Sequence, residues 1–309
     1  MTGTPDPTQS DESIYAELVD HAHVDDAGHW AFGTDFEDPL AGVDTTLPAG
    51  VDGADLAAYC LMLGDDALIA SHRLSEWCSH APDLEDDIAL ANIALDLLGQ
   101  ARLLLARAAA ARDDRDDVRP PEDTLAFFRE AQDFKNVRLV EAENGDFGET
   151  IARLLVFSTF RLALLEELRR SRDHVLAAVA EKGVKEVTYH RDYAASWFVT
   201  LARGTEESRR RISEGLDQVW PYLDELFQAD DTETRLSQAG VAADPSILRA
   251  DVDAVLDQVF EAAVISRPEI APMAAVGGRT GRQGLHTEAL SHLLATMQSV
   301  ARAHPEGRW

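Results

Sequence analysis

The stretch Ile88–Arg107, IALANIALDLLGQARLLLAR, decides the fold of this chain, because it reads as one helix that is apolar almost all the way round. Its polar exceptions are Asn92, Asp96 and Gln100, which are spaced four residues apart and therefore follow one face of a helix. A helix that is apolar on every side belongs in the middle of a helical bundle, so this polar line is expected to face inward. A buried carboxylate is costly when it is alone, so we expect Asp96 to be ion-paired, hydrogen-bonded or bound to metal.

The rest of the chain from about residue 54 also has the pattern of helices joined by short connections. Prolines, which interrupt helices, fall at the expected boundaries or in loops. No alternating apolar and polar run is long enough for a sheet, so the fold class is predicted to be all-α. Helices are expected near residues 54–79, 84–113, 122–131, 147–171, 173–203, 205–228, 245–264 and 285–303.

The first 53 residues are expected to form an acidic, partly disordered, irregular extension to a helical domain over 54–309. Turn-forming residues in this extension alternate with the aromatic residues Trp30, Phe32 and Phe36. Two interpretations of these aromatic side chains stay open. The segment either lies loosely on its own bundle or is an arm that docks on a partner subunit.

The charge of the chain is strongly acidic. It has 56 Asp and Glu residues against 28 Lys and Arg, a formal net charge of −28, and its lysines are Lys135, Lys182 and Lys185. Such a surface stays hydrated in concentrated salt, where screening over roughly 3 Å at 1 M removes much of the self-repulsion. We therefore predict a halophilic source, with an ordinary acidic bacterial protein as the alternative. The negative field argues against nucleic acid or an anionic membrane as the main partner.

The cysteines and the hydropathy pattern indicate a reduced, cytoplasmic protein. If Cys60 and Cys78 share a helix, the rise of about 1.5 Å per residue separates them by roughly 27 Å, beyond disulfide reach. No N-terminal stretch combines a basic start with an apolar run, and no stretch approaches about 20 uninterrupted apolar residues. Neither a signal peptide nor a membrane span is expected.

Five stretches of the chain carry a resemblance to a known family. They are SHRLSEWCSHAPDLEDDIALANIALDLLGQAR (71–102), EDTLAFFRE (122–130), NGDFGETIAR (144–153), VKEVTYHRDY (184–193) and GGRTGRQGLHTEAL (277–290). In this order they are similar to the PaaC family, one of the component families of the multicomponent phenylacetyl-coenzyme A epoxidase. The resemblance extends from about Asp55 to Trp309, and the strings LANIALDLLGQAR and GLHTE are its most specific parts.

The resemblance implies a ferritin-like helical bundle with additional C-terminal helices. It implies that this chain holds no cofactor and partners a related catalytic subunit, PaaA, which holds the di-iron centre and binds the acyl-coenzyme A. Other epoxidase subunits, including a reductase, and phenylacetyl-coenzyme A itself would be met through the complex. By this resemblance the chain is the non-catalytic partner.

The metal-ligand pattern of ferritin-like enzymes is incomplete in this sequence. Their di-iron sites use Glu-x-x-His motifs on two helices, together with further carboxylates. None of the ten histidines has Glu three residues before it. Gly99 lies three residues after Asp96, and Tyr189 lies three residues after Glu186, where His would be needed. This absence favours a metal-free chain.

Carboxylates are nevertheless predicted to meet where the metal would have been. Asp65 precedes Asp96 by a spacing that lets adjacent antiparallel helices bring both to the same height. Several buried carboxylates would repel one another, so a basic side chain is expected among them. The alternative is that Asp65 lies on an exposed helix face beside Asp66. The predicted pseudo-metal site comprises Asp65, Asp96, Glu186, Tyr189, Arg153 and Lys185.

A second candidate site is GGRTGRQGLHTE (277–288), the one concentrated basic and glycine-rich stretch in this acidic chain. Arginine side chains can grip a phosphate or a carboxylate, and a helix that begins just afterwards exposes its amide groups. We favour packing against the partner subunit, with contact to the coenzyme A phosphates and a plain connecting loop as alternatives. The candidate contact residues are Arg279, Arg282, His286 and Glu288.

Two functions from different classes follow from these patterns. The chain is either a structural subunit that stabilises PaaA within phenylacetyl-coenzyme A epoxidase, or a catalytically active or metal-handling di-iron protein in its own right. The absence of Glu-x-x-His discriminates between them and favours the structural subunit.

Overall fold

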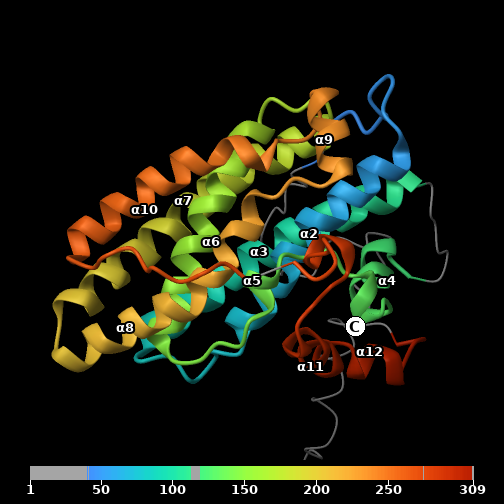
Figure 1. Ribbon diagram of the computed structural model, residues 1–309. Coiled ribbons are helices and arrows are strands. Elements are labelled where there is room, and N and C mark those ends of the chain that lie inside the picture. Colours follow the sequence, from blue (N-terminus) through green and yellow to red (C-terminus); the bar gives the residue numbers. More distant parts are fainter. Residues whose placement is uncertain (1–39, 41, 113–118, 274, 308–309) are drawn as a thin grey trace, which may run out of the picture. The chain divides into compact units, whose positions relative to one another are not determined.

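The computed structural model describes residues 40, 42–112, 119–273 and 275–307, and over these ranges the chain is all-α, as predicted (Figure 1). Outside the helices, the same ranges contain one isolated antiparallel bridge, between Val276 and Arg279. The helices belong to one compact unit, Gly42–Trp309. Most of the expected N-terminal extension, with its three aromatic residues, lies outside the described residues.

Four long helices form the bundle of this unit. α2 packs along α3, α6 packs along α7, and contacts between α3 and α7 join the two pairs. Aspartates begin three of these helices, because the side chains of Asp52, Asp146 and Asp173 accept hydrogen bonds from backbone N–H groups of the first turn. The arrangement agrees with the predicted ferritin-like bundle. The helices are α2 (Gly53–Ser75), α3 (Leu84–Arg112), α6 (Phe147–Leu168) and α7 (His174–Arg203).

The helix that is buried almost all the way round is α6 and not α3. Every residue from Thr150 to Leu162 is buried, whereas α3 leaves a row of leucine and isoleucine side chains exposed. The prediction that α3 lies in the middle of the bundle is therefore wrong. Its apolar composition combines a face that packs inside the bundle with a bare outer face.

α3 also has the length and the apolar composition of a helix that could cross a membrane. Within the described residues it is the one helix whose length and apolar character would allow it to cross a membrane. The core helix of a water-soluble bundle meets the same criterion, and the inner side of α3 packs on α2 and α7. The bare outer face of α3 is the feature that needs an explanation.

Shorter elements surround the bundle, and three predicted helices are divided, including the one expected over 245–264, which begins as a 3₁₀ turn. The helix expected over 205–228 changes to 3₁₀ geometry at Trp220, where Pro221 supplies no backbone N–H. The helix expected over 285–303 breaks at Gln298. The shorter α-helices are α4 (Pro121–Phe127), α5 (Arg138–Glu141), α8 (Glu206–Val219), α9 (Asp231–Gln238), α10 (Arg249–Ala263), α11 (Glu288–Met297) and α12 (Ser299–Ala303). The 3₁₀ turns are η1 (Ala131–Asp133), η2 (Trp220–Phe227), η3 (Pro245–Leu248) and η4 (Gly281–Gln283).

Candidate functional site

A chain of hydrogen bonds crosses the bundle through side chains of α3, α6 and α7. Arg161 Nε on α6 donates to Gln100 Oε1 at 2.9 Å, and Gln100 Nε2 donates to Glu186 Oε2 on α7, also at 2.9 Å. Gly183 makes room for Gln100, because a Cβ at this position would lie 2.9 Å from a Leu165 methyl group and 3.4 Å from the Gln100 amide carbon. The three side chains meet between α3, α6 and α7. Ferritin-like enzymes likewise direct their metal ligands from facing helices into the bundle.

Arg161 places a positive charge in the core. Its side chain is among the largest that are fully buried. Burial lowers the pKa of Arg161 to about 10, while the charges of Asp66 and Glu186 act in the opposite direction, so the guanidinium remains protonated at neutral pH. Its Nη1 donates to the carbonyl of Leu63, and its Nη2 has no hydrogen-bond partner within the described residues.

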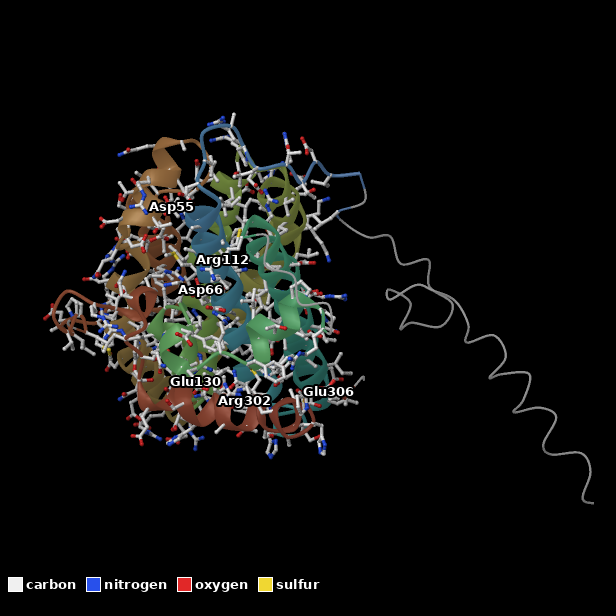
Figure 2. The ribbon with its side chains drawn as sticks, turned by 90° about the vertical axis from the view of Figure 1, so that its right-hand side faces the viewer. Asp55, Asp66, Arg112, Glu130, Arg302 and Glu306 are labelled. Carbon is white, nitrogen blue, oxygen red and sulfur yellow. The ribbon has the colours of Figure 1, made fainter. Side chains whose placement is uncertain are left out.

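The two adjacent aspartates of α2 are both buried and paired with arginines. Asp65 accepts hydrogen bonds from both terminal nitrogens of Arg129 and from the backbone N–H of Lys135. Asp66, labelled on α2 in Figure 2, binds Arg282 through both oxygens, at 3.0 and 2.9 Å. The alternative that Asp65 lies on an exposed face is therefore wrong.

The predicted carboxylates are held by different partners and not by one shared cation. Asp65 pairs with Arg129, as described above, whereas Asp96 Oδ2 lies 3.0 Å from His190 Nε2, and the Asp96 side chain is 38% exposed. Glu186 binds Gln100 and lies 3.4 Å from Lys182. The predicted cluster does not form because one side of α3 lies at the surface. Asp96 therefore stays in partial contact with solvent.

The predicted cations are also elsewhere. Arg153 donates to the carbonyls of Ala142 and Glu143, at 2.6 and 2.7 Å. It therefore holds the segment that precedes α6 against that helix. Lys185 and Tyr189 lie on the exposed side of α7. Arg161 was missed, although it interrupts the apolar run LLVFSTFRLALL (154–165) just as Asp96 interrupts that of α3. The rule that a charge inside an apolar helix needs a partner applies to it equally.

The glycine-rich loop (277–288) mainly makes contacts inside the protein, and we call the buried contacts that hold it in place the clamp. Arg282 is buried, and Gly281 packs so tightly that an added Cβ would meet the Asn136 carbonyl, while its N–H donates to Glu225 at 3.0 Å. The prediction that Arg282 faces a partner or coenzyme A is wrong, because Asp66 occupies both of its terminal nitrogens.

His286 belongs to the same clamp. Its Nδ1 lies 2.7 Å from Glu141 Oε2, and its Nε2 lies 2.9 Å from the carbonyl of Phe134, so both ring nitrogens face acceptors. Burial alone would lower the pKa of His286, but the hydrogen bond and charge of Glu141 outweigh it and raise the pKa. The prediction of a contact role for His286 is wrong for the same reason as for Arg282.

Two residues of the predicted contact set do reach the surface. Arg279 is exposed beside Gly277 and Gly278, which have positive φ, and its guanidinium donates to the Gln283 carbonyl. Glu288 is exposed and lies 3.6 Å from the exposed His292. The loop thus presents its tip to solvent and its base to the core.

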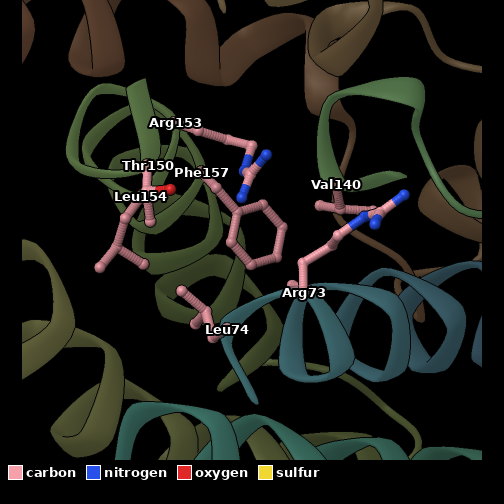
Figure 3. Close-up of a pocket in the computed structure, with 8 residues that line it drawn as sticks. Arg73, Leu74, Val140, Thr150, Arg153, Leu154 and Phe157 are labelled. Carbon is pink, nitrogen blue, oxygen red and sulfur yellow. The ribbon is translucent and has the colours of Figure 1, made fainter. Parts of the chain in front are cut away.

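A small cavity lies between α2 and α6. Its volume of about 20 Å³ suits a single water molecule and is far too small for an acyl thioester. In Figure 3, Arg153 and Phe157 of α6 stand opposite Arg73 and Leu74 of α2. The cavity is lined by Ala70, Arg73, Leu74, Val140, Thr150, Arg153, Leu154 and Phe157. Over the described residues, no three His, Cys, Asp or Glu side chains are grouped to hold a metal ion.

The bundle and its polar core define a ferritin-like helical protein. The chain belongs to the family described as phenylacetic acid catabolic protein, whose model matches residues 44–309. It is 43% identical over 255 residues to the C component of the 1,2-phenylacetyl-CoA epoxidase of Escherichia coli strain K12, covering 82% of this chain and 99% of that protein. These comparisons confirm the family resemblance found in the sequence.

Proposed function

We propose that the chain is a non-catalytic structural subunit of a phenylacetyl-coenzyme A epoxidase and stabilises a PaaA-type subunit that holds the di-iron centre. Its likeness to the C component of such an epoxidase, over nearly the whole of that protein, supports the complex. The observation that carries the structural role is the Arg161–Gln100–Glu186 chain of hydrogen bonds in the bundle core.

The chemistry of this core disfavours a metal centre. An iron pair needs inward carboxylate and imidazole ligands, whereas α3 and α6 here direct an amide and a guanidinium inward. The guanidinium stays protonated and repels a metal cation. The guanidinium of Arg161 also places a positive charge near Glu186. The negative charge of Glu186 therefore needs no metal ion to balance it.

The exposed part of the glycine-rich loop is the part that can meet another subunit or coenzyme A. Arg279 and Glu288 keep this proposed role, whereas Arg282 and His286 hold the loop in place. This chain would meet the reductase and the acyl-coenzyme A through the assembled complex. A cytoplasmic location and a halophilic source remain part of the proposal.

The proposal is tested by iron analysis of the purified chain, alone and after assembly with its PaaA-type subunit. The chain alone should hold no stoichiometric iron and should not oxidise phenylacetyl-coenzyme A when reductase is supplied. The assembled complex should do both, with the isolated PaaA-type subunit as the control. Near-stoichiometric iron with a carboxylate-bridged spectrum in the isolated chain would instead support the di-iron alternative.

A further inference from the structure

The phenol of Tyr193 on α7 is hydrogen-bonded to a buried carboxylate in the first turn of α3. Tyr193 Oη donates to Asp86 Oδ1 at 2.7 Å, and Asp86 is only 3% exposed. The second carboxylate oxygen, Oδ2, is buried and accepts no hydrogen bond from the residues that the structure describes. The pair therefore places a proton donor in direct contact with a proton acceptor, away from solvent.

Burial makes Asp86 a stronger base than an ordinary aspartate. It raises the pKa of the Asp86 carboxyl group, and the hydrogen bonds of Tyr193 and Trp197 offset this only in part. The pKa of the Tyr193 phenol is also raised, by its own burial and by its contact with Asp86. At neutral pH the phenol therefore keeps its proton and shares it with the carboxylate through the hydrogen bond.

This arrangement favours oxidation of the phenol. A phenol that loses one electron also releases its proton, because its radical cation is a very strong acid. A base within hydrogen-bond reach takes that proton directly, which makes the electron easier to remove. Over the described ranges, Tyr193 alone among the tyrosines donates to a carboxylate. The hydroxyl of Tyr59, by contrast, accepts a hydrogen bond from the backbone N–H of Ala243.

Aromatic rings connect Tyr193 to the protein surface. Tyr189 is 53% exposed and stacks on Tyr193, with ring centroids 6.4 Å apart. On the other side, Trp197 contacts Phe147 of α6 edge to face, at 5.2 Å. Electrons tunnel rapidly between rings at such distances, so an oxidant beside Tyr189 can draw an electron from Tyr193. An indole is harder to oxidise than a phenol that gives up its proton, so the oxidation is expected to end at Tyr193 and not at Trp197.

We propose that Tyr193 is a redox-active residue with Asp86 as its proton acceptor. A one-electron oxidant, a radical or a metal complex strong enough to oxidise a phenol, takes one electron from Tyr193. The phenolic O–H bond breaks, its proton passes to Oδ1 of Asp86, and a neutral tyrosyl radical and a carboxylic acid remain. A one-electron reductant of the ascorbate class returns the electron, and the proton moves back to the phenol oxygen. The chain thereby takes up and releases an oxidising equivalent without net chemical change.

The first test is photo-oxidation of the full chain by a ruthenium tris-bipyridine sensitiser with a cobalt(III) electron acceptor. Electron paramagnetic resonance of the frozen sample should show a tyrosyl radical in the native chain. Tyr193→Phe should lose most of this signal. Tyr222→Phe, at a half-buried tyrosine, is the matched control and should keep it, and circular dichroism should show both variants folded. An equal signal in the native chain and Tyr193→Phe would overturn the proposal.

The second test follows the proton. The rate of radical formation, measured by transient absorption, should be independent of pH near neutrality in the native chain, because the proton stays within the protein. In Asp86→Asn the rate should rise with pH, since water and hydroxide must then take the proton, and Asp86→Glu should restore the flat profile. The same pH profile in the native chain and Asp86→Asn would show that Asp86 is not the acceptor. A native rate that grows with buffer concentration would show the same without any variant.

The third test concerns the route of the electron. Tyr189→Phe should keep the tyrosyl radical at Tyr193 but form it more slowly, because phenylalanine is much harder to oxidise. An unchanged rate would contradict the route through Tyr189. None of these measurements requires iron, acyl-coenzyme A or another subunit, so this inference and the proposed function can fail independently.

Discussion

The guanidinium of Arg282 binds both carboxylate oxygens of Asp66, at 3.0 and 2.9 Å, although the two residues are 216 positions apart. Both are buried. Burial opposes the charge of Arg282, but Asp66 and nearby Glu233 outweigh it and raise its pKa. The pair holds the glycine-rich loop against the middle of α2.

Replacing Arg282 by Ala should therefore destabilise the fold. It leaves the Asp66 charge buried without its cation, which costs about 3–5 kcal/mol of unfolding free energy. Arg279→Ala, in the exposed tip of the same loop, is the matched control and should change little. Urea denaturation measures both, and equal midpoints for the two variants would show that the Arg282 pair does not hold the loop.

His286 should make stability depend on pH. Its pKa in the folded chain is raised above the ordinary value of 6.5. The stability that its protonated ring contributes is then fully present below 6.5 and is lost as the pH rises through the raised folded value. The difference in unfolding free energy between the native chain and His286→Gln should shrink across this window. A difference that is constant or grows with pH would contradict the pairing with Glu141.

The Arg161–Gln100 hydrogen bond should appear as an energetic coupling. Arg161→Met removes the donor to Gln100 Oε1, and Gln100→Leu removes the acceptor of Arg161 Nε. Each single change leaves a buried polar group unsatisfied, at about 1–3 kcal/mol. The double variant should therefore lose less stability than the sum of the two singles. If the losses of unfolding free energy, measured by urea denaturation, add strictly, the two side chains do not act together.

Salt should stabilise the chain. Lowering the salt from about 1 M to 0.1 M lengthens the screening distance from roughly 3 to 10 Å, so repulsion within a chain of net charge −28 grows. The melting temperature should fall over this range. Scanning calorimetry at several salt concentrations measures it, and an unchanged melting temperature would count against halophilic adaptation.

The fold could be predicted from sequence because its determinants are local. Apolar periodicity and flanking prolines and aspartates identify long helices, and α7 (His174–Arg203) matches the expected 173–203. The position of α3 could not be predicted. Composition alone does not distinguish a face that packs in the core from one that is exposed, and α3 has both.

The site was predicted only in part. Asn92, Asp96 and Gln100 were expected to face inward. Gln100 is buried and joins α3 to Glu186 of α7, but Asn92 is exposed and Asp96 is partly exposed, so this prediction is wrong for both. Arg161 could have been found by the rule that was applied to Asp96. The pairing of Asp66 with Arg282 could not, because nothing in the local pattern of either segment specifies a contact between residues so far apart.

By the proposed function, this chain contributes no ligand to the iron that its partner subunit would hold. The most direct measurement is iron content and phenylacetyl-coenzyme A turnover of the assembled complex when this chain carries Asp96→Asn together with Glu186→Gln. Both substitutions keep the side-chain shape and remove the charges that a metal would need. We predict unchanged iron per complex and unchanged turnover. Loss of iron, with the complex still assembled, would show that these carboxylates bind metal and would contradict the structural role.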